Sequence, residues 1–438
     1  MFGTRNPHPD YAKALARRDF LKLAAFGAAG SSMSGWLEPL ASAAAQDGKH
    51  KSCIVLWLAG GLSQLESFDL KEYSFFKPID TSVPGIQVSD HLPKLAKLMQ
   101  HAAVIRSMCT LEAEHSRAAY HMHTGGRPIA GGTVLPSIGS IASMELGKPD
   151  YPLPNYVVIG APLANGGSRV GDGAHAGFLG ARHEPLLIKK PTRGVENLAP
   201  VANDLKLFDQ RAGLLNQVEQ GFYKNYQAPT AEAHRITLQR ASQMMHSKEA
   251  KAYDLSLEPA SVREAYGKNG YGDGCVLARR LVEVRVPFVE VSMPEWDNHS
   301  GCGYHKQNMP AFDTALSALI TDLKDRGLLD STLIVVMSEF GRGGTNHVGP
   351  DAKSAENRNH WHKAWSTALI GGGIKGGQVI GRTDKKAAIV EDRPVTPADF
   401  FATICKVLGI DYTKENNDGR GRPMRIVDKG EKPILEVL

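Results

Sequence analysis

The fold is decided by the stretch LIVVMSEFGR, residues 333–342. Its first five residues are an unbroken apolar run, which is typical of a strand buried on both faces of a parallel sheet. The polar residues begin where this run stops. Ligands of open α/β sheets collect outside the carboxyl ends of the strands, so Glu339 and Arg342 stand where chemistry is usually found. A glutamate after a strand is also a common turn or cap residue, so its position alone does not establish a site.

Similar apolar runs recur on both sides of this stretch and alternate with helical patterns. Strands are predicted at residues 53–59, 102–108, 155–160, 286–292, 333–337 and 365–371. Helices are predicted at 90–100, 136–146, 273–283, 309–326 and 397–408, with one more beginning near His115. This alternation predicts an α/β fold with a mainly parallel central sheet flanked by helices.

The texture of the sequence changes from about residue 161 to residue 270. Glycine-rich loops come first, and long polar helical patterns follow at about 202–226 and 231–253. We interpret this stretch as a helical insertion or lid within one domain that spans residues 46–438. Its charges suit a solvated face, although a lid of this size could shape a pocket.

Length and composition are those of a globular protein. The chain has 438 residues, of which 42% are apolar and 22% charged, so it can bury a sizeable core. The formal charge of +5 is small for this length and includes a basic leader. No nucleic-acid partner is therefore predicted. The five cysteines are an odd number with no close pair, which indicates neither a disulfide framework nor a zinc ribbon.

The N-terminus resembles a twin-arginine export signal. Arg17 and Arg18 precede a weakly apolar run at 23–33, and a small-residue tract ends at Ala45. The run is too short and too rich in glycine to serve as a stable membrane anchor. We therefore expect a signal peptide at residues 1–45, recognition by the twin-arginine translocation machinery, and a periplasmic or secreted protein. The alternative is an amphipathic N-terminal helix.

Candidate metal ligands follow one predicted strand and precede another. Asp297 and His299 lie one residue apart in a loop after the strand at 286–292, so both could point at one ion. They could equally be a turn aspartate and an exposed histidine. His360 and His362 lie shortly before the strand at 365–371, and either could be surface polar or a satisfied core histidine.

Two further groups of residues are candidates. On a helix beginning near His115, the spacing places His115 and His123 on one face, where either could touch substrate or be a solvated or core histidine. A tight turn at Gly60 and Gly61 ends the first strand, with the sequence QLESFD following at 64–69. The carboxylates of this segment could reach a metal, but carboxylates near a strand end are often helix caps.

Six ordered segments resemble domain of unknown function family 1501, across essentially the whole mature chain. They are residues 58–61 (LAGG), 115–117 (HSR) with 124–125 (TG), 296–299 (WDNH), 338–342 (SEFGR), 359–361 (NHW) and the glycine-rich 371–381. The segment PVTPAD at 394–399 also fits. The resemblance implies a branch of the alkaline phosphatase and sulfatase superfamily. It therefore implies an alkaline phosphatase-like fold and the hydrolysis of phosphate or sulfate esters at metals along the carboxyl edge of a parallel sheet.

The chain departs from the superfamily pattern at three places. Glu339 keeps the acid of a Ser-Asp-His-Gly-like segment, whereas Phe340 replaces a histidine ligand. The first strand ends in Gly60 rather than in an aspartate, and Glu66 or Asp69 could substitute. Ala113 stands near the position of the sulfatase nucleophile and cannot attack an ester.

Together, these residues lead to one hypothesis and two alternatives. The hypothesis is an exported metal-dependent hydrolase that acts on an anionic ester or an envelope polysaccharide. A divalent ion (zinc, calcium or magnesium) would activate water, and its ligands would be Asp297, His299, Glu339 and His360, with His362 in reserve. Arg117, Arg127 and Arg342 would bind the anionic group. His115 would be the general acid or base, and His123 would contact the substrate. One alternative is a non-catalytic cell-envelope binding protein that retains the fold. The other is a phosphomutase or ester-transfer enzyme with Thr110 or Ser116 as nucleophile.

Overall fold

A computed structural model describes residues 50–129, 132–160, 173–200, 204–225, 229–299, 302–343 and 358–438. These residues belong to one compact unit, Asp47–Leu438. The expected export signal at 1–45 lies outside the described residues. Within the described ranges, no helix combines the length and apolar character needed to cross a membrane.

The core of the fold is an eight-stranded sheet with the strand order β12-β4-β11-β8-β1-β7-β5-β6. Its members are β1 (Ser52–Leu58), β4 (Ala102–Met108), β5 (Tyr156–Ile159), β6 (Leu186–Ile188), β7 (Phe288–Met293), β8 (Thr332–Met337), β11 (Trp365–Gly371) and β12 (Gln378–Ile380). Every neighbouring pair is parallel except the two that involve β11. The predicted α/β fold with a mainly parallel sheet is confirmed.

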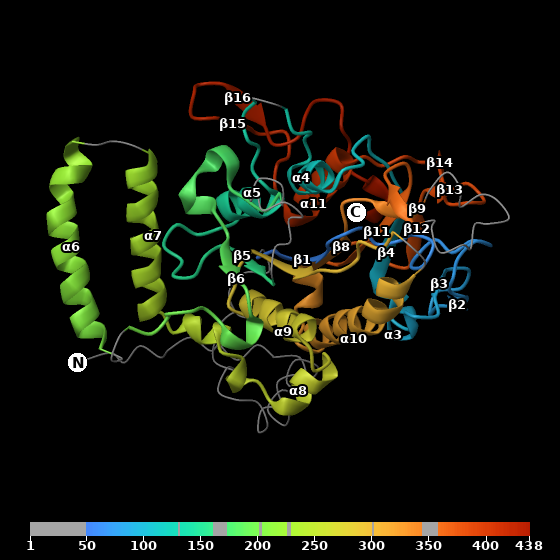
Figure 1. The fold of residues 1–438 in the computed structure, drawn as a ribbon, viewed down its shortest axis with the longest axis horizontal. Coiled ribbons are helices and arrows are strands. Elements are labelled where there is room, and N and C mark those ends of the chain that lie inside the picture. Colours follow the sequence, from blue (N-terminus) through green and yellow to red (C-terminus); the bar gives the residue numbers. More distant parts are fainter. Residues whose placement is uncertain are drawn as a thin grey trace, which may run out of the picture. The chain divides into compact units, whose positions relative to one another are not determined.

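The apolar runs form the central strands because both of their faces are covered. All residues of β1 and β8 are buried, with Val55 facing Glu290 of β7 on one side and Val335 of β8 on the other. Helices α9 (Gly270–Glu283) and α10 (Gly303–Asp325) cover one face, as Figure 1 shows. Helices α4 (His115–Thr124), α5 (Ile138–Glu145) and α11 (Pro397–Leu408) cover the other.

Three predicted elements differ in extent. The helix expected at 90–100 is only α3 (Pro93–Ala96), followed by a separate 3-10 turn at Met99–His101. Helix α10 begins six residues before its predicted start and contains Pro310. The stretch from about 161 to 270 holds α6 (Leu205–Asn225), α7 (Pro229–His246) and α8 (Ala260–Ala265), and it also contributes β6 to the sheet.

Short antiparallel two-stranded sheets are formed in addition to the eight-stranded sheet. They pair β2 (Pro78–Asp80) with β3 (Gln87–Ser89), β9 (Gly341–Gly343) with β10 (Asn359–Trp361), β13 (Arg382–Thr383) with β14 (Val390–Asp392), and β15 (Glu415–Asn417) with β16 (Pro423–Arg425).

The reversed direction of β11 matters for function. Gly371, the last residue of β11, faces Leu333 near the start of β8, so the first residue of β11 lies at the carboxyl edge of the parallel strands. The segment before β11, which contains His360, therefore reaches the same edge as the residues that follow β1, β7 and β8. The glycine-rich stretch that follows β11 starts at the opposite edge.

Candidate metal centre

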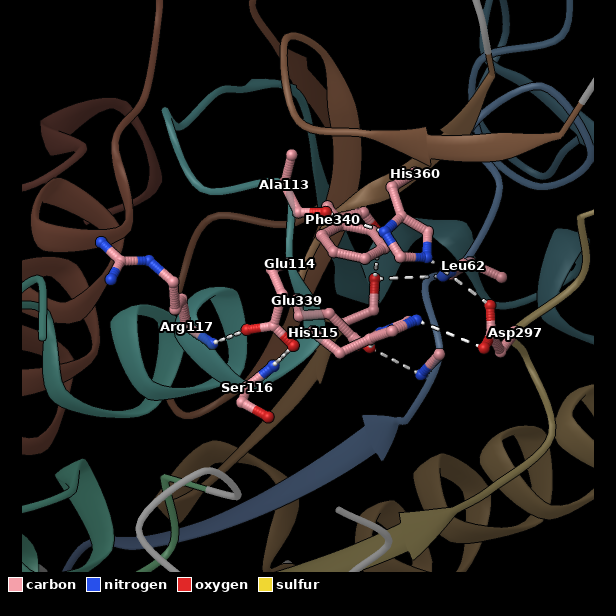
Figure 2. Close-up of polar contacts among 12 residues, drawn as sticks. Leu62, Ala113, Glu114, His115, Ser116, Arg117, Asp297, Glu339, Phe340 and His360 are labelled. Carbon is pink, nitrogen blue, oxygen red and sulfur yellow. Dashed lines mark hydrogen bonds and ion pairs between the residues drawn. The ribbon is translucent and has the colours of Figure 1, made fainter. Parts of the chain in front are cut away.

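Five chain segments meet at the carboxyl edge of the sheet (Figure 2). They are the turn after β1, the loop after β7, the end of β8, the start of α4 and the strand β10. The side chains that converge there are His115, Asp297, Glu339 and His360, each from a different segment.

The turn after β1 needs glycine for two reasons. Gly60 has φ +115°, a conformation that side chains rarely adopt. A Cβ on Gly60 would also lie 2.2 Å from the backbone nitrogen of Asp297. The backbone N–H of Gly60 donates to Oε1 of Glu339 at 2.8 Å. The turn therefore lies directly against the loop of Asp297 and fixes the carboxylate of Glu339.

The start of α4 places His115 in the centre. The Glu114 carboxylate caps the helix by accepting the backbone N–H groups of Ser116 and Arg117 at 3.1 and 3.0 Å. Nδ1 of His115 then donates to Oε1 of Glu339 at 2.7 Å. Its Nε2 lies 3.3 Å from Oδ2 of Asp297.

His360 is oriented by the backbone and by an aromatic ring. Its Nδ1 must carry the proton, because it lies 2.7 Å from the carbonyl oxygen of Ala113, which can only accept. Its ring stacks on Phe340 at a centroid distance of 4.6 Å and meets the His115 ring edge-on at 4.2 Å. Phe340, which stands where the superfamily pattern has a histidine, supports the ring of His360 by stacking.

These residues fit a metal ion. One ligand atom from each of His115, Asp297 and His360 lies within 4.8 Å of the other two. Nε2 of both histidines is buried and forms no hydrogen bond among the described residues, although it lies 3.3 Å (His115) and 3.8 Å (His360) from the Asp297 carboxylate. The Nδ1 atoms of both rings donate to a carboxylate and to a carbonyl, the usual way in which metal-binding histidines are oriented. Two imidazoles and one carboxylate form a donor set that zinc favours.

Arg342 shapes the electrostatics of this cluster. Its guanidinium is buried, donates to Oδ1 of Asp297 at 2.5 Å and also binds the carbonyl oxygen of Gly60. Burial alone would raise the pKa of Asp297, but Arg342 outweighs it and lowers the pKa. Burial opposes protonation of His115, yet Glu339 and Asp297 raise its pKa above the usual value. The pKa of His360 is lowered by burial and by its cationic neighbours.

Three predicted ligands, His299, His362 and Glu339, lie outside this three-residue cluster. His299 lies at its rim, where Nε2 is 2.9 Å from Oδ1 of Asp297 and Nδ1 is 3.0 Å from the side-chain oxygen of Asn359. The carbonyl of His362 accepts the backbone N–H of Thr110, while its Nδ1 is buried without a partner among the described residues. Glu339 lies beside the cluster and contacts it through His115.

The residues predicted to bind substrate are spread over α4 and its C-terminal extension. His123 is fully buried, with Nε2 3.2 Å from Glu290 and Nδ1 donating to the carbonyl of Ala119. Arg117 and Arg127 both bind Glu112, at 2.7 and 2.6 Å. In Figure 2 the guanidinium of Arg117 points away from His115 and His360.

The carboxylates of the segment after β1 have partners other than the cluster. Glu66 forms a buried ion pair with Arg358, with Oε1 2.9 Å from Nη2. Asp69 lies 2.9 Å from Nζ of Lys71 and accepts from the hydroxyl of Thr383. The sequence did not predict the roles of Arg358, which pairs with Glu66, and of the Ala113 carbonyl, which accepts from His360. An arginine outside a motif and a backbone oxygen have no recognisable sequence pattern.

Among known proteins, the family profile described as "Protein of unknown function (DUF1501)" matches residues 50–438. No curated protein matches the chain.

Several solved structures resemble the fold at low identity. The lipoteichoic acid synthase LtaP from Listeria monocytogenes is 12% identical, with 82% of this chain and 72% of that chain covered and a TM-score of 0.39. The sulfatase PsFucS1 from Pseudoalteromonas sp. is 13% identical, with coverages of 91% and 76% and a TM-score of 0.39. The alkaline phosphatase from the Antarctic bacterium TAB5 is 11% identical, with coverages of 83% and 99% and a TM-score of 0.35. The DUF1501 profile spans the described residues from 50 to 438. The protein therefore belongs to the DUF1501 family.

Proposed function

We propose that this protein is an exported, metal-dependent hydrolase of sulfate or phosphate esters. The observation that carries the proposal is the convergence of His115, Asp297 and His360 within 4.8 Å, with two buried Nε2 atoms that face the Asp297 carboxylate but form no hydrogen bond among the described residues. Such an arrangement is costly unless an ion binds these atoms. The choice of ester follows from the superfamily resemblance of the sequence motifs.

In this proposal each residue has a distinct task. His115, Asp297 and His360 hold the ion, which when bound polarises an ester oxygen and lowers the pKa of water. Glu339 orients His115 through its 2.7 Å hydrogen bond. Arg342 holds the Asp297 carboxylate, so it acts on the ion through Asp297.

His299 is the imidazole best placed to exchange a proton with substrate. Its side chain is 54% exposed, against 15% for that of His115, and its Nε2 lies 2.9 Å from Oδ1 of Asp297. A solvent-exposed imidazole can exchange a proton with a bound substrate and can therefore serve as acid or base. Ala113 offers the site only its carbonyl, so the attacking group in this proposal is water.

The test is hydrolysis of 4-nitrophenyl phosphate and 4-nitrophenyl sulfate by the mature protein. Activity should disappear with a chelator, return with zinc, and be lost in His360→Ala but kept in His246→Ala, which removes a surface histidine paired with Asp209. Activity that survives both chelation and His360→Ala would contradict the proposal. Metal binding without hydrolysis of either ester would favour the non-catalytic envelope-binding protein. The ion pair between Arg342 and Asp297 also supports this alternative, because it occupies a carboxylate that would otherwise bind the ion.

A further inference from the structure

We propose that a cavity beyond the carboxyl end of β4 binds an amphipathic organic anion, a small molecule with an apolar body and one sulfonate, sulfate, phosphate or carboxylate group. The cavity lies among the loop after β4, the end of α4, the start of α11 and β16, and Figure 1 shows α4 beside α11. The inference goes beyond ester hydrolysis and does not depend on it.

The cavity has the size and the wall of a small-molecule site. Its volume is about 530 Å³, within the usual range for ligand pockets. Phe178, Ile426 and Val427 contribute to its apolar wall. Leu111 and Ile129 also line it and remain 76% and 79% exposed. Large aliphatic side chains left in water beside a cavity indicate a surface that an apolar ligand body would cover.

An arginine held in a fixed position supplies the anion-binding half. Nε of Arg127 donates to Oε1 of Glu112 at 2.6 Å, and no described residue binds its two terminal nitrogens. Arg117 occupies the same carboxylate through Nε and Nη2, at 2.7 and 3.2 Å. The arginines lower the pKa of the buried Glu112 to about 2. The Glu112 carboxylate thus pairs with the guanidinium groups of both Arg117 and Arg127. The three groups together carry a net positive charge, and the terminal nitrogens of Arg127 can donate to an anion.

A neutral imidazole adds a donor deeper in the wall. His121 lines the cavity and is 8% exposed, and burial lowers its pKa to about 4. Nδ1 of His121 lies 3.0 Å from the hydroxyl of Thr110, which accepts the backbone N–H of Glu112 at 3.4 Å. The Thr110 hydroxyl can donate to Nδ1, and in that tautomer the proton of the neutral ring sits on Nε2. No described residue binds that Nε2, which leaves an N–H donor for the ligand.

The remaining charged residues of the wall do not cancel this preference. Arg422 and Arg425 also line the cavity, opposite in sign to Asp428 and Glu431. With Arg127, the wall holds three arginines against these two carboxylates. Arginine therefore outnumbers charged carboxylate in the wall.

The cavity and the metal cluster share one loop. Cys109, Thr110 and Leu111 line the cavity, while the carbonyl of Ala113, two residues on, accepts from His360. Thr110 also contacts the segment that carries His360, because its backbone N–H donates to the carbonyl of His362 at 2.8 Å. A ligand in the cavity would therefore contact the loop that orients His360.

The experiment is calorimetric titration of the mature, chelator-treated protein with hexane-1-sulfonate, methanesulfonate and hexan-1-ol. Hexane-1-sulfonate carries both halves of the expected ligand, has no ester bond, and is tested with the metal removed. It should bind at one site at least about tenfold more tightly than either of the other two probes, which each lack one half.

Two variants and one control locate the binding. Arg127→Gln and Leu111→Asp should each weaken binding of hexane-1-sulfonate at least about tenfold, and both positions are exposed enough for the variants to fold. Arg382→Gln, which removes an arginine from an exposed ion pair outside the cavity, should change binding less than about twofold. Absent saturable binding, equal binding of the three probes, or equal losses in Arg127→Gln and Arg382→Gln would overturn the proposal. None of these outcomes bears on hydrolysis, so the two proposals fail separately.

Discussion

Nδ1 of His115 lies 2.7 Å from Oε1 of Glu339, and the same oxygen accepts the backbone N–H of Gly60 at 2.8 Å. The carboxylate thus connects the turn after β1 to the start of α4 and aims Nε2 of His115 at the cluster. If Glu339 orients His115, Glu339→Gln should weaken zinc binding by about 10- to 100-fold. Competition against a fluorescent chelator measures this. A loss as complete as that in His115→Ala would mean that Glu339 itself binds the ion.

Gly60→Ala should destabilise the fold and displace Asp297. The substitution combines a positive φ with a Cβ 2.2 Å from the Asp297 backbone nitrogen, and we expect a loss on the order of 1–3 kcal/mol or more in the free energy of unfolding. Urea denaturation provides the measurement. Gly409→Ala is the matched control, because Gly409 has φ +80° but no atom within 4 Å of the added Cβ. Equal losses in the two variants would show that contact with Asp297 adds nothing.

The buried pair of Glu66 and Arg358 should be a main anchor of the segment that carries His360. Glu66→Gln removes the buried carboxylate that pairs with the Arg358 guanidinium, which costs about 3–5 kcal/mol. Glu391→Gln, in an exposed pair with Arg382, should cost at most about 1 kcal/mol. Chemical denaturation compares the two. Similar losses would contradict the structural weight given to Glu66.

The same pair predicts a direction for acid unfolding. Burial alone would raise the pKa of Glu66, but Arg358 outweighs it and lowers the pKa below the usual value. The pair therefore stabilises the fold above the unfolded-state pKa of about 4.5, and this contribution is lost as the pH falls through the lower folded-state pKa. Wild-type stability should decline more steeply with acid in this range than that of Glu66→Gln. Parallel curves of unfolding free energy against pH would refute this.

The buried pair of His123 and Glu290 predicts the opposite dependence. Burial opposes protonation of His123, but Glu290 outweighs it and raises the pKa. The stabilisation of the fold by this pair is complete below the unfolded-state pKa of His123, about 6.5. It is lost as the pH rises through the folded-state pKa of His123. As the pH rises above about 6.5, Glu290→Gln should therefore lose less stability than wild type. Urea titrations at several pH values would show this, and an equal decline in both proteins would contradict it.

The strands were predictable because of their burial on both faces. Residues 53–59 and 333–337 are unbroken apolar runs that became β1 and β8 with shifts of one residue. The reversal of β11 was not predictable, because an apolar run has the same pattern in either direction. Without that reversal, the position of His360 at the site edge could not be derived.

The candidate site was predictable in its residue types and not in its pairings. Periodicity placed His115 and His123 on one face of α4. Their partners lie far along the chain, because Glu339 follows β8 and Glu290 belongs to β7. The division of labour between ligand and orienting residue depends on distances of a few ångströms between such segments. Only the folded chain supplies them.

In the proposed site, His115, Asp297 and His360 hold one ion and His362 does not. Elemental analysis of the purified mature protein after incubation with zinc and removal of the excess tests it most directly. We expect about one zinc per wild-type chain, about one in His362→Ala, and almost none in His115→Ala or His360→Ala, because each loss leaves only two ligands. No zinc in wild type, or full zinc in His360→Ala, would contradict the account.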